Sequence, residues 1–178
     1  MAPEYIVLTA IGADRVGIVD DLSGALLTAG CNIEESKMAI LGGEFAVIML
    51  VSGPAAAVQS LSRSLADLGG KLHLRIDAKP TREPRPPAAG RPYLLEAVSL
   101  DTPGIVHSVT AILREANVNI EDLETDSGAA PWTGAPMFRL KAHLIVEPSV
   151  SIARLRERLM GLEQEHDLDI TLTPVFEG

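Results

Sequence analysis

Two short stretches of the sequence carry residue types that suit the binding of a small amino acid. Each has an aspartate followed three residues later by a glycine, Asp14 with Gly17 and Asp101 with Gly104, shortly after an apolar run. A helix that starts there would offer free N–H groups and its positive dipole end to a carboxylate, while the aspartate would meet an ammonium group. Alternatively, each aspartate is only an N-cap for that helix. Both interpretations stay open, and one carboxylate can fill both roles.

A second pair of polar residues repeats together with these stretches. Asn32 is followed by Ile33 and Glu34, and Asn119 is followed by Ile120 and Glu121. The two asparagine amides either hydrogen-bond a bound amino acid or have an ordinary role in a turn. The predicted ligand-binding residues are therefore Gly12, Ala13, Asp14, Arg15, Val16, Gly17, Ile18, Asn32 and Ile33 in the first half, and Asp101, Thr102, Pro103, Gly104, Ile105, Asn119 and Ile120 in the second.

The other reactive side chains form no recognisable catalytic or metal site. Cys31 is the single cysteine and has no activating histidine motif, so we expect a small buried residue. The four histidines lack the spacing of a metal-binding pair on one helix. His107 lies near a predicted helix start, where it either lines the site or faces solvent. Gly12 and Gly17 lack the Lys-Ser/Thr of a phosphate loop. We predict no catalytic residue, no metal and no cofactor.

The elements expected around these residues occur in the same order in both halves. In the first half, apolar periodicity predicts strands at 5–11, 32–40, 44–51 and 71–76 and helices at 16–29 and 55–68. Gly30 is the expected C-terminal cap of the first helix, and Gly69-Gly70 are expected to end the second. A Gly42-Gly43 hairpin should join the second and third strands. The second half repeats this order, with strands at 93–98, 118–125, 137–146 and 169–175 and helices opening at Pro103 and Pro148.

This order predicts an α+β fold of two tandem ferredoxin-like βαββαβ domains. Each would be an antiparallel four-stranded sheet with helices on one face. Because the other face of each sheet needs cover, we expect the units to pack on each other or on a partner, and we expect a homodimer. The predicted domains are 1–78 and 93–178.

A proline-rich stretch, 79–92, is the predicted linker. Its five prolines cannot lie in a helix interior or a central strand, so the linker should be extended and fairly stiff. In the second half, a longer segment at 126–136 replaces the tight glycine hairpin. Trp132 within that segment either anchors a partner or folds back over its own sheet.

Composition argues against direct binding of nucleic acid or membrane. The formal net charge is −9, whereas affinity for nucleic acid rests on Lys and Arg that neutralise phosphates. The densest basic segment, 79–91, is also the proline-rich one. No apolar run approaches the roughly 20 residues needed to span a bilayer. A single cysteine and an N-terminus without a signal-peptide pattern lead us to expect a cytoplasmic protein.

The residues that repeat resemble those of the ACT domain family. Both halves have Asp-x-x-Gly-Ile-Val after the first strand and Asn-Ile at the start of the second. The first half, at 9–19, 30–36 and 44–50, is similar to the glycine cleavage system transcriptional repressor family, as is the linker at 82–87. Val16 stands where that family usually has proline, and the second half matches that family only in outline.

The resemblance implies an amino-acid-sensing regulator without a DNA-binding module of its own. Such repressors act by binding a transcription activator, and glycine or a similar small amino acid modulates the contact. The alternative is a regulatory subunit that modulates a metabolic enzyme in response to an amino acid. An enzyme is the weakest class, because no acid, base and nucleophile converge in the sequence. Copurification with an activator or with a metabolic enzyme would separate the first two classes.

Overall fold

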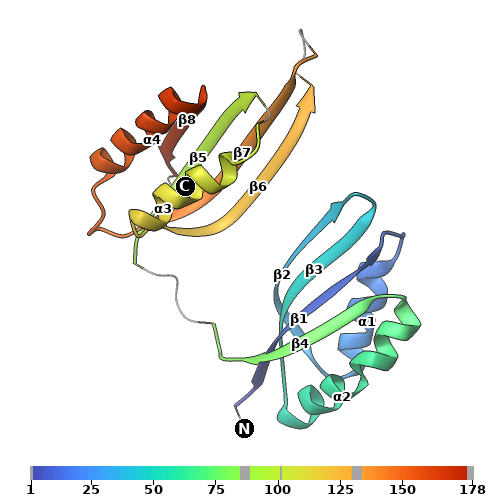
Figure 1. Cartoon of the computed structure of the whole chain (residues 1–178). Helices are drawn as coiled ribbons and strands as arrows, with labels where there is room; N and C mark the ends of the chain where they lie inside the picture. Colours follow the sequence, from blue (N-terminus) through green and yellow to red (C-terminus); the bar gives the residue numbers. More distant parts are fainter. Residues whose placement is uncertain (1, 85–88, 101, 130–133, 176–178) are drawn as a thin grey trace. The chain divides into compact units, whose positions relative to one another are not determined.

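The structure is a computed structural model that describes residues 2–84, 89–100, 102–129 and 134–175. The chain divides into two compact units, residues 1–85 and 86–178. Each unit has the order βαββαβ and each contains one four-stranded antiparallel sheet (Figure 1). The predicted α+β fold of two tandem ferredoxin-like units is confirmed.

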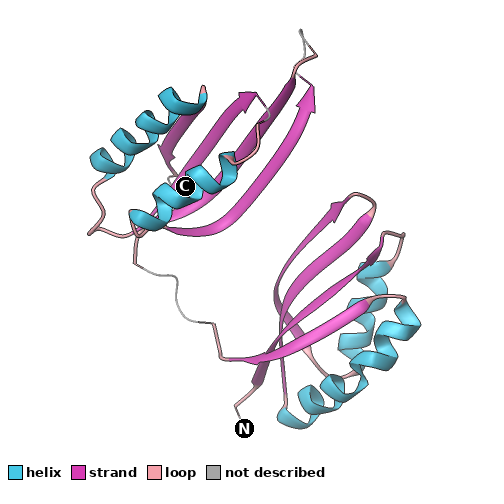
Figure 2. Ribbon diagram, in the orientation of Figure 1, coloured by secondary structure: helices cyan, strands magenta, loops and turns pink. Residues whose placement is uncertain are grey.

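In the first unit, both helices pack on one face of the sheet (Figure 2). The strand order is β2-β3-β1-β4, so β3 and β1 are the inner strands. The elements are β1 (Glu4–Ala13), α1 (Ile18–Thr28), β2 (Asn32–Leu41), β3 (Glu44–Gly53), α2 (Ala55–Leu72) and β4 (Arg75–Thr81).

The second unit repeats this arrangement with the order β6-β7-β5-β8. Its two helices again cover one face of the sheet (Figure 2). The elements are β5 (Arg91–Leu100), α3 (Ile105–Glu115), β6 (Asn119–Ala129), β7 (Pro136–Val146), α4 (Ile152–His166) and β8 (Asp169–Pro174).

Each core consists mainly of aliphatic side chains between the sheet and its helices. Alternate residues of β1, such as Ile6 and Leu8, are buried against leucines of α1 and α2. Complete burial of one such side chain contributes about 1.5–3 kcal/mol. Cys31 belongs to this core, as predicted, and burial raises the pKa of its thiol.

The faces that point away from the helices differ between the units. We call them open faces. In the first unit the paired residues are mostly apolar, and Ile11 and Ile48 are 48% and 50% exposed. In the second unit the three central cross-strand pairs each include a charged residue or a histidine, whereas the end pairs Pro92–Ile145 and Leu100–Met137 are apolar. The pairs compared are Val7–Leu50, Thr9–Ile48 and Ile11–Ala46 in the first unit, and Leu94–His143, Glu96–Lys141 and Val98–Arg139 in the second.

The two β-hairpins differ in length. Gly42 and Gly43 have φ angles of 61° and 85°, which fit a two-residue type I′ turn, and this hairpin prediction is confirmed. In the second unit the predicted long segment is wrong at its N-terminal end, because β6 continues to Ala129 and pairs there with Pro136. Cross-strand pairing, including an ion pair of 3.0 Å between Asp126 and Arg139, extends the strands. Trp132 lies outside the described residues.

The first helix of each unit ends in the same hydrogen-bonded motif. The amide of Cys31 donates to Leu26 O, and the amide of Gly30 donates to Leu27 O. Gly30 has a φ of 75° and occupies the left-handed position of a Schellman motif, as predicted. Asn117, with a φ of 56°, takes that position after α3, and asparagine tolerates it better than most residues with a side chain.

The prediction that Gly69-Gly70 end α2 is wrong. The helix continues to Leu72, and His73 in a left-handed conformation caps it. Gly69 is buried because the chain returns directly above it: a Cβ there would lie 2.6 Å from Leu74 O. The glycine therefore permits a close backbone approach inside the helix. As a consequence, β4 starts at Arg75, four residues later than predicted.

Strands occupy both ends of the proline-rich stretch at 79–92. Pro80 lies in β4, an edge strand, where a missing N–H is tolerated. Pro92 lies in the inner strand β5, contrary to expectation, but it is only the second residue, and its carbonyl accepts a hydrogen bond from Val175 N at 2.9 Å.

The start of α4 also differs from the prediction. Pro148 lies in the preceding turn, and Ser151 is the N-cap, with a side chain that accepts from Arg154 N.

Candidate functional site

The loop after β1 holds the first predicted site, and a glycine organises it. Gly17, with a φ of 89°, is the N-cap of α1, and the helix has no side-chain cap. Asp14 lies four residues before Ile18, its side chain is exposed, and its amide donates to Gly43 O at 2.9 Å. The N-cap interpretation of Asp14 is therefore wrong, because the left-handed turn at Gly17 starts the helix later than position 16.

The loop after β5 has the same backbone. Gly104, with a φ of 101°, is the N-cap of α3, and its carbonyl accepts from Ser108 N at 3.0 Å. Pro103 lies in the turn before the helix and not in its first turn, which corrects the prediction. Asp101 lies outside the described residues.

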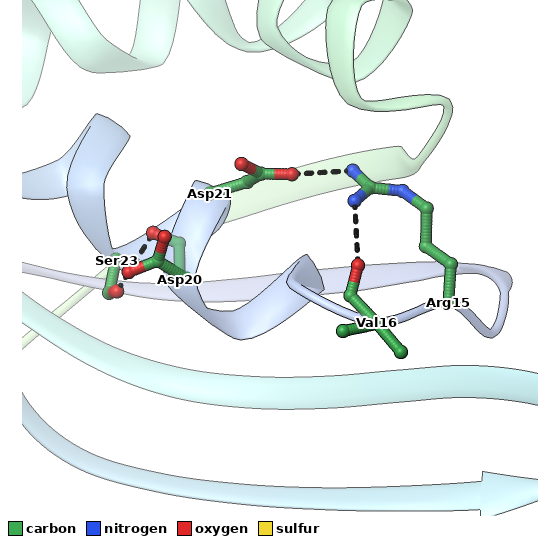
Figure 3. A network of polar contacts seen from close by, with 5 residues as sticks. All are labelled: Arg15, Val16, Asp20, Asp21 and Ser23. Atoms are coloured by element: carbon green, nitrogen blue, oxygen red, sulfur yellow. Dashed lines mark hydrogen bonds and ion pairs between the residues drawn. The ribbon is translucent and has the colours of Figure 1, made fainter.

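An arginine that sequence reasoning placed in the site without a role braces the first loop (Figure 3). Arg15 Nη2 lies 2.7 Å from Asp21 Oδ2, and Nη1 donates to the carbonyl oxygen of Val16 at 3.3 Å. The two charged side chains are 41% and 42% exposed, so solvent screens the pair. The sequence signal for this ion pair was the presence of opposite charges six residues apart, on either side of the helix start.

In the second loop a proline ring takes the place of this ion pair. Thr102 and Ser108 stand where the first unit has Arg15 and Asp21, so they cannot form an ion pair. Pro103 stands at the position of Val16, and its ring fixes φ near −65°.

The two helix starts also differ in charge. The first turn of α1 contains Asp20 and Asp21, of which only Asp21 is paired with Arg15. The first turn of α3 contains no acidic residue. A carboxylate ligand would therefore be repelled by Asp20 in the first turn of α1, whereas the first turn of α3 has no such group.

Asn32 and Asn119 lie at the other end of their sheets. Asn32 pairs with Ser52, which pairs with Tyr5 near the start of β1, whereas Asp14 follows the last residue of β1. The eight-residue interval along the strand is roughly 25 Å. Asn119 likewise pairs with Ile145 at the start of the second sheet. A single unit does not bring its loop and its asparagine together.

The Asn32 side chain is part of a small polar network. Its Nδ2 donates to Glu34 Oε1 at 3.1 Å, and the hydroxyl of Ser52 donates to the same oxygen. These bonds, with that of Ser52 first, hold the pKa of Glu34 below its ordinary value of 4.5. In the second unit Ile145 pairs with Asn119 and offers no such hydroxyl.

The described ranges hold neither a metal-binding cluster nor a membrane-spanning helix. No three His, Cys, Asp or Glu side chains there gather closely enough to hold a metal ion. None of the helices there is long and apolar enough to cross a bilayer.

Comparison with known proteins identifies the family. The sequence profile of the ACT domain family matches residues 4–79, which contain the first loop and Asn32. The glycine cleavage system transcriptional repressor of Escherichia coli K12 is 39% identical over 159 residues, which cover 89% of this chain and 83% of the repressor. The chain belongs to this repressor family.

Solved structures extend the agreement to both units. A protein of unknown function from Galdieria sulphuraria superposes with a TM-score of 0.82 at 34% identity, covering 98% of this chain and all of that one. A structure described as a candidate glycine cleavage system transcriptional repressor superposes with a TM-score of 0.74 over 99% of this chain and all of that one. At 22% identity, that second likeness shows the fold alone.

The two loops can now be compared as parts of a repressor-family chain. The ACT profile covers the first loop, whereas the second loop lies beyond the matched residues, yet both have a left-handed glycine at the helix start. The shared backbone and the different side chains indicate that the geometry is kept while the chemistry has diverged.

Proposed function

We propose that the chain is an amino-acid-sensing regulator that represses transcription through protein contacts and not by direct DNA binding. The 39% identity to the E. coli repressor, over most of both chains, carries this proposal. A net charge of −9 supports it, because specific DNA binding draws much of its strength from cations that neutralise phosphates. In this proposal the protein acts in the cytoplasm and has no catalytic role.

We propose the two glycine-led loops and the two asparagines as the effector site. Because a loop and an asparagine lie at opposite ends of one sheet, one unit alone does not complete the site, and a second copy of the chain would supply the missing element. The effector is glycine or a similar small amino acid, with its carboxylate at the helix start and its ammonium at Asp14 or Asp101. A homodimer fits this requirement. The domain boundaries 1–78 and 93–178, with a linker at 79–92, remain part of the proposal.

A gel-shift assay with purified protein at about 0.15 M salt tests the DNA part of the proposal, since phosphate contacts weaken steeply with salt. We expect no sequence-specific shift without a second protein. A specific shift by the purified chain alone would overturn the proposal and direct attention to the basic segment at 79–91.

Copurification tests the partner. We expect a transcription activator to be retained on the immobilised full chain, with a yield that glycine changes. Retention of a metabolic enzyme in its place would support the alternative function, a regulatory subunit that responds to an amino acid.

A further inference from the structure

A pocket of about 760 Å³ lies at the end of the first unit opposite the Asp14–Gly17 loop. The start of β1, the end of β4 and the first turns of α2 form it. β1 begins beside this pocket and ends at the loop, so the two places are separated by the length of the strand.

The pocket combines an apolar base with a charged rim. Ile6 and Val58 lie in its lining and are 2% and 4% exposed, and Pro3 and Pro80 add apolar surface. The charged lining residues are two cations and two anions: Arg63, Arg82, Glu4 and Glu83. A ligand with one charge of each sign and an apolar part matches this lining.

The charged groups of the rim are available to a ligand. Within the described ranges, no hydrogen bond or ion pair joins the side chains of Arg63, Arg82, Glu4 or Glu83 to another residue. Two carboxylates at the rim oppose a simple anion such as phosphate, and two guanidinium groups oppose a simple cation. A zwitterion satisfies both signs at once.

Tyr5 also belongs to the lining, although strand alternation places its side chain on the face opposite to Ile6. Burial, followed by the charges of Glu83 and Glu34, raises the pKa of this phenol. The hydroxyl therefore keeps its proton at neutral pH and adds no charge beside the pocket.

The second unit has a longer side chain at the helical position of Ser62. Leu61 and Leu155 occupy the same helical position, so Ser62 corresponds to Arg156. Arg156 Nη2 donates to the carbonyl oxygen of Leu172 at 2.8 Å, which ties α4 to β8. Ser62 is short, and its hydroxyl donates to Val58 O within its own helix, so it leaves the space open.

We propose that this pocket binds a zwitterionic amino acid with an aliphatic side chain. The ammonium group lies between Glu4 and Glu83, the carboxylate faces Arg63 and Arg82, and the side chain contacts Ile6 and Val58. Glycine has no side chain to reach this base. The pocket is thus a second ligand site, separate from the loops proposed for the small effector. Because Arg82 and Glu83 follow β4 directly, occupancy holds the start of the segment that leads to the second unit.

Isothermal titration of L-leucine into the full chain tests this site. We expect saturable binding, and we expect Arg63→Ala and Glu83→Ala each to weaken it roughly tenfold, the loss of one charge-assisted hydrogen bond. Ser62→Arg, which copies the second unit, should abolish binding. Arg75→Ala, an exposed arginine at the far end of β4, is the matched control and should leave the affinity unchanged.

Two outcomes would overturn the proposal: no heat of binding with L-leucine at millimolar concentration, or binding that survives all three pocket variants. Thermal melts of Arg63→Ala check that loss of binding is not loss of folding. Asp14→Ala should weaken glycine binding and leave leucine binding intact, so a failure at the loops and a failure at this pocket are told apart.

Discussion

The two units form the same turn before their first helix, but different side chains stabilise it. The first holds it with an exposed ion pair between Arg15 and Asp21, and the second holds it with the ring of Pro103. An ion pair can exchange its carboxylate for that of a ligand and is weakened by salt, whereas a proline ring cannot be released. The first loop is therefore the adjustable one.

The open faces of the sheets differ in a related way. Ile48 in β3 corresponds to Lys141 in β7, and Ile11 in β1 corresponds to Val98, which faces Arg139. The charged face of the second unit is stable in water. The apolar face of the first unit has the composition of a contact surface. The two units therefore share a fold, but only the first has an open face that suits a partner.

The largest effect should come from exchanging these faces. Ile48→Lys places a charge on the open face of the first unit, and we expect it to weaken self-association of the proposed homodimer roughly tenfold or more, since an isoleucine contributes about 1.5–3 kcal/mol when buried. Light scattering over a concentration series measures this. Lys141→Ala is the control and should change nothing; equal association in both variants would show that the open face is not the contact.

The next effect concerns the interior of α2. Gly69→Ala forces a Cβ against Leu74 O and should lower the free energy of unfolding by about 1–3 kcal/mol. Gly70→Ala meets nothing within 4 Å and should raise it by roughly 0.5–1 kcal/mol. At the position of Gly69 the second unit has Glu163, whose side chain accepts from Ile170 N at 2.7 Å.

Urea unfolding of the Gly69 and Gly70 variants gives both values. Equal stability of the two alanine variants would mean that the close approach to Leu74 is not tight in solution.

A smaller effect is expected at the first loop. Arg15→Ala removes an exposed pair and should cost about 0–1 kcal/mol, less at high salt. Val16→Pro copies the second unit and should restore about 0.4–1 kcal/mol by restricting the unfolded chain. Thermal melts of Arg15→Ala, of Val16→Pro and of the double variant measure both changes in stability. If the salt dependence of the melting temperature persists in Arg15→Ala, the ion pair is not its source.

The smallest effect is on titration. Ser52→Ala removes the main bond to Glu34 and should move the pKa of that carboxyl up toward 4.5, whereas the wild-type value lies below it. Because the folded pKa is lowered, the contribution of this group is full above the unfolded value and is lost as pH falls through the folded one. Carboxyl NMR titration detects the shift; an unchanged pKa in Ser52→Ala would assign the effect elsewhere.

The sequence was a good guide to the elements and a poor one to their ends. Apolar periodicity and the internal repeat predicted the strands and helices in order, because burial on one face imposes that pattern. It failed at Gly69, where a glycine serves a close tertiary contact inside a helix and not a helix end. It also predicted the start of the first helix at 16, two residues too early, because the left-handed turn at Gly17 delays the helix start.

The residues proposed for the effector site can be named from the sequence, but their arrangement cannot. The loops and the asparagines repeat in the sequence, and nothing local reveals that strand direction places them at opposite ends of a sheet. The pocket beside Arg63 was not visible either, since its lining comes from three separate segments.

A thermal-shift screen of the twenty amino acids, run on the full chain and on Asp14→Ala, tests the central claim that this is an amino-acid sensor. The account predicts that glycine or another small amino acid raises the melting temperature of the wild type, by mass action on the folded state, and that Asp14→Ala reduces this rise. The absence of any shift with all twenty amino acids at millimolar concentration would contradict it.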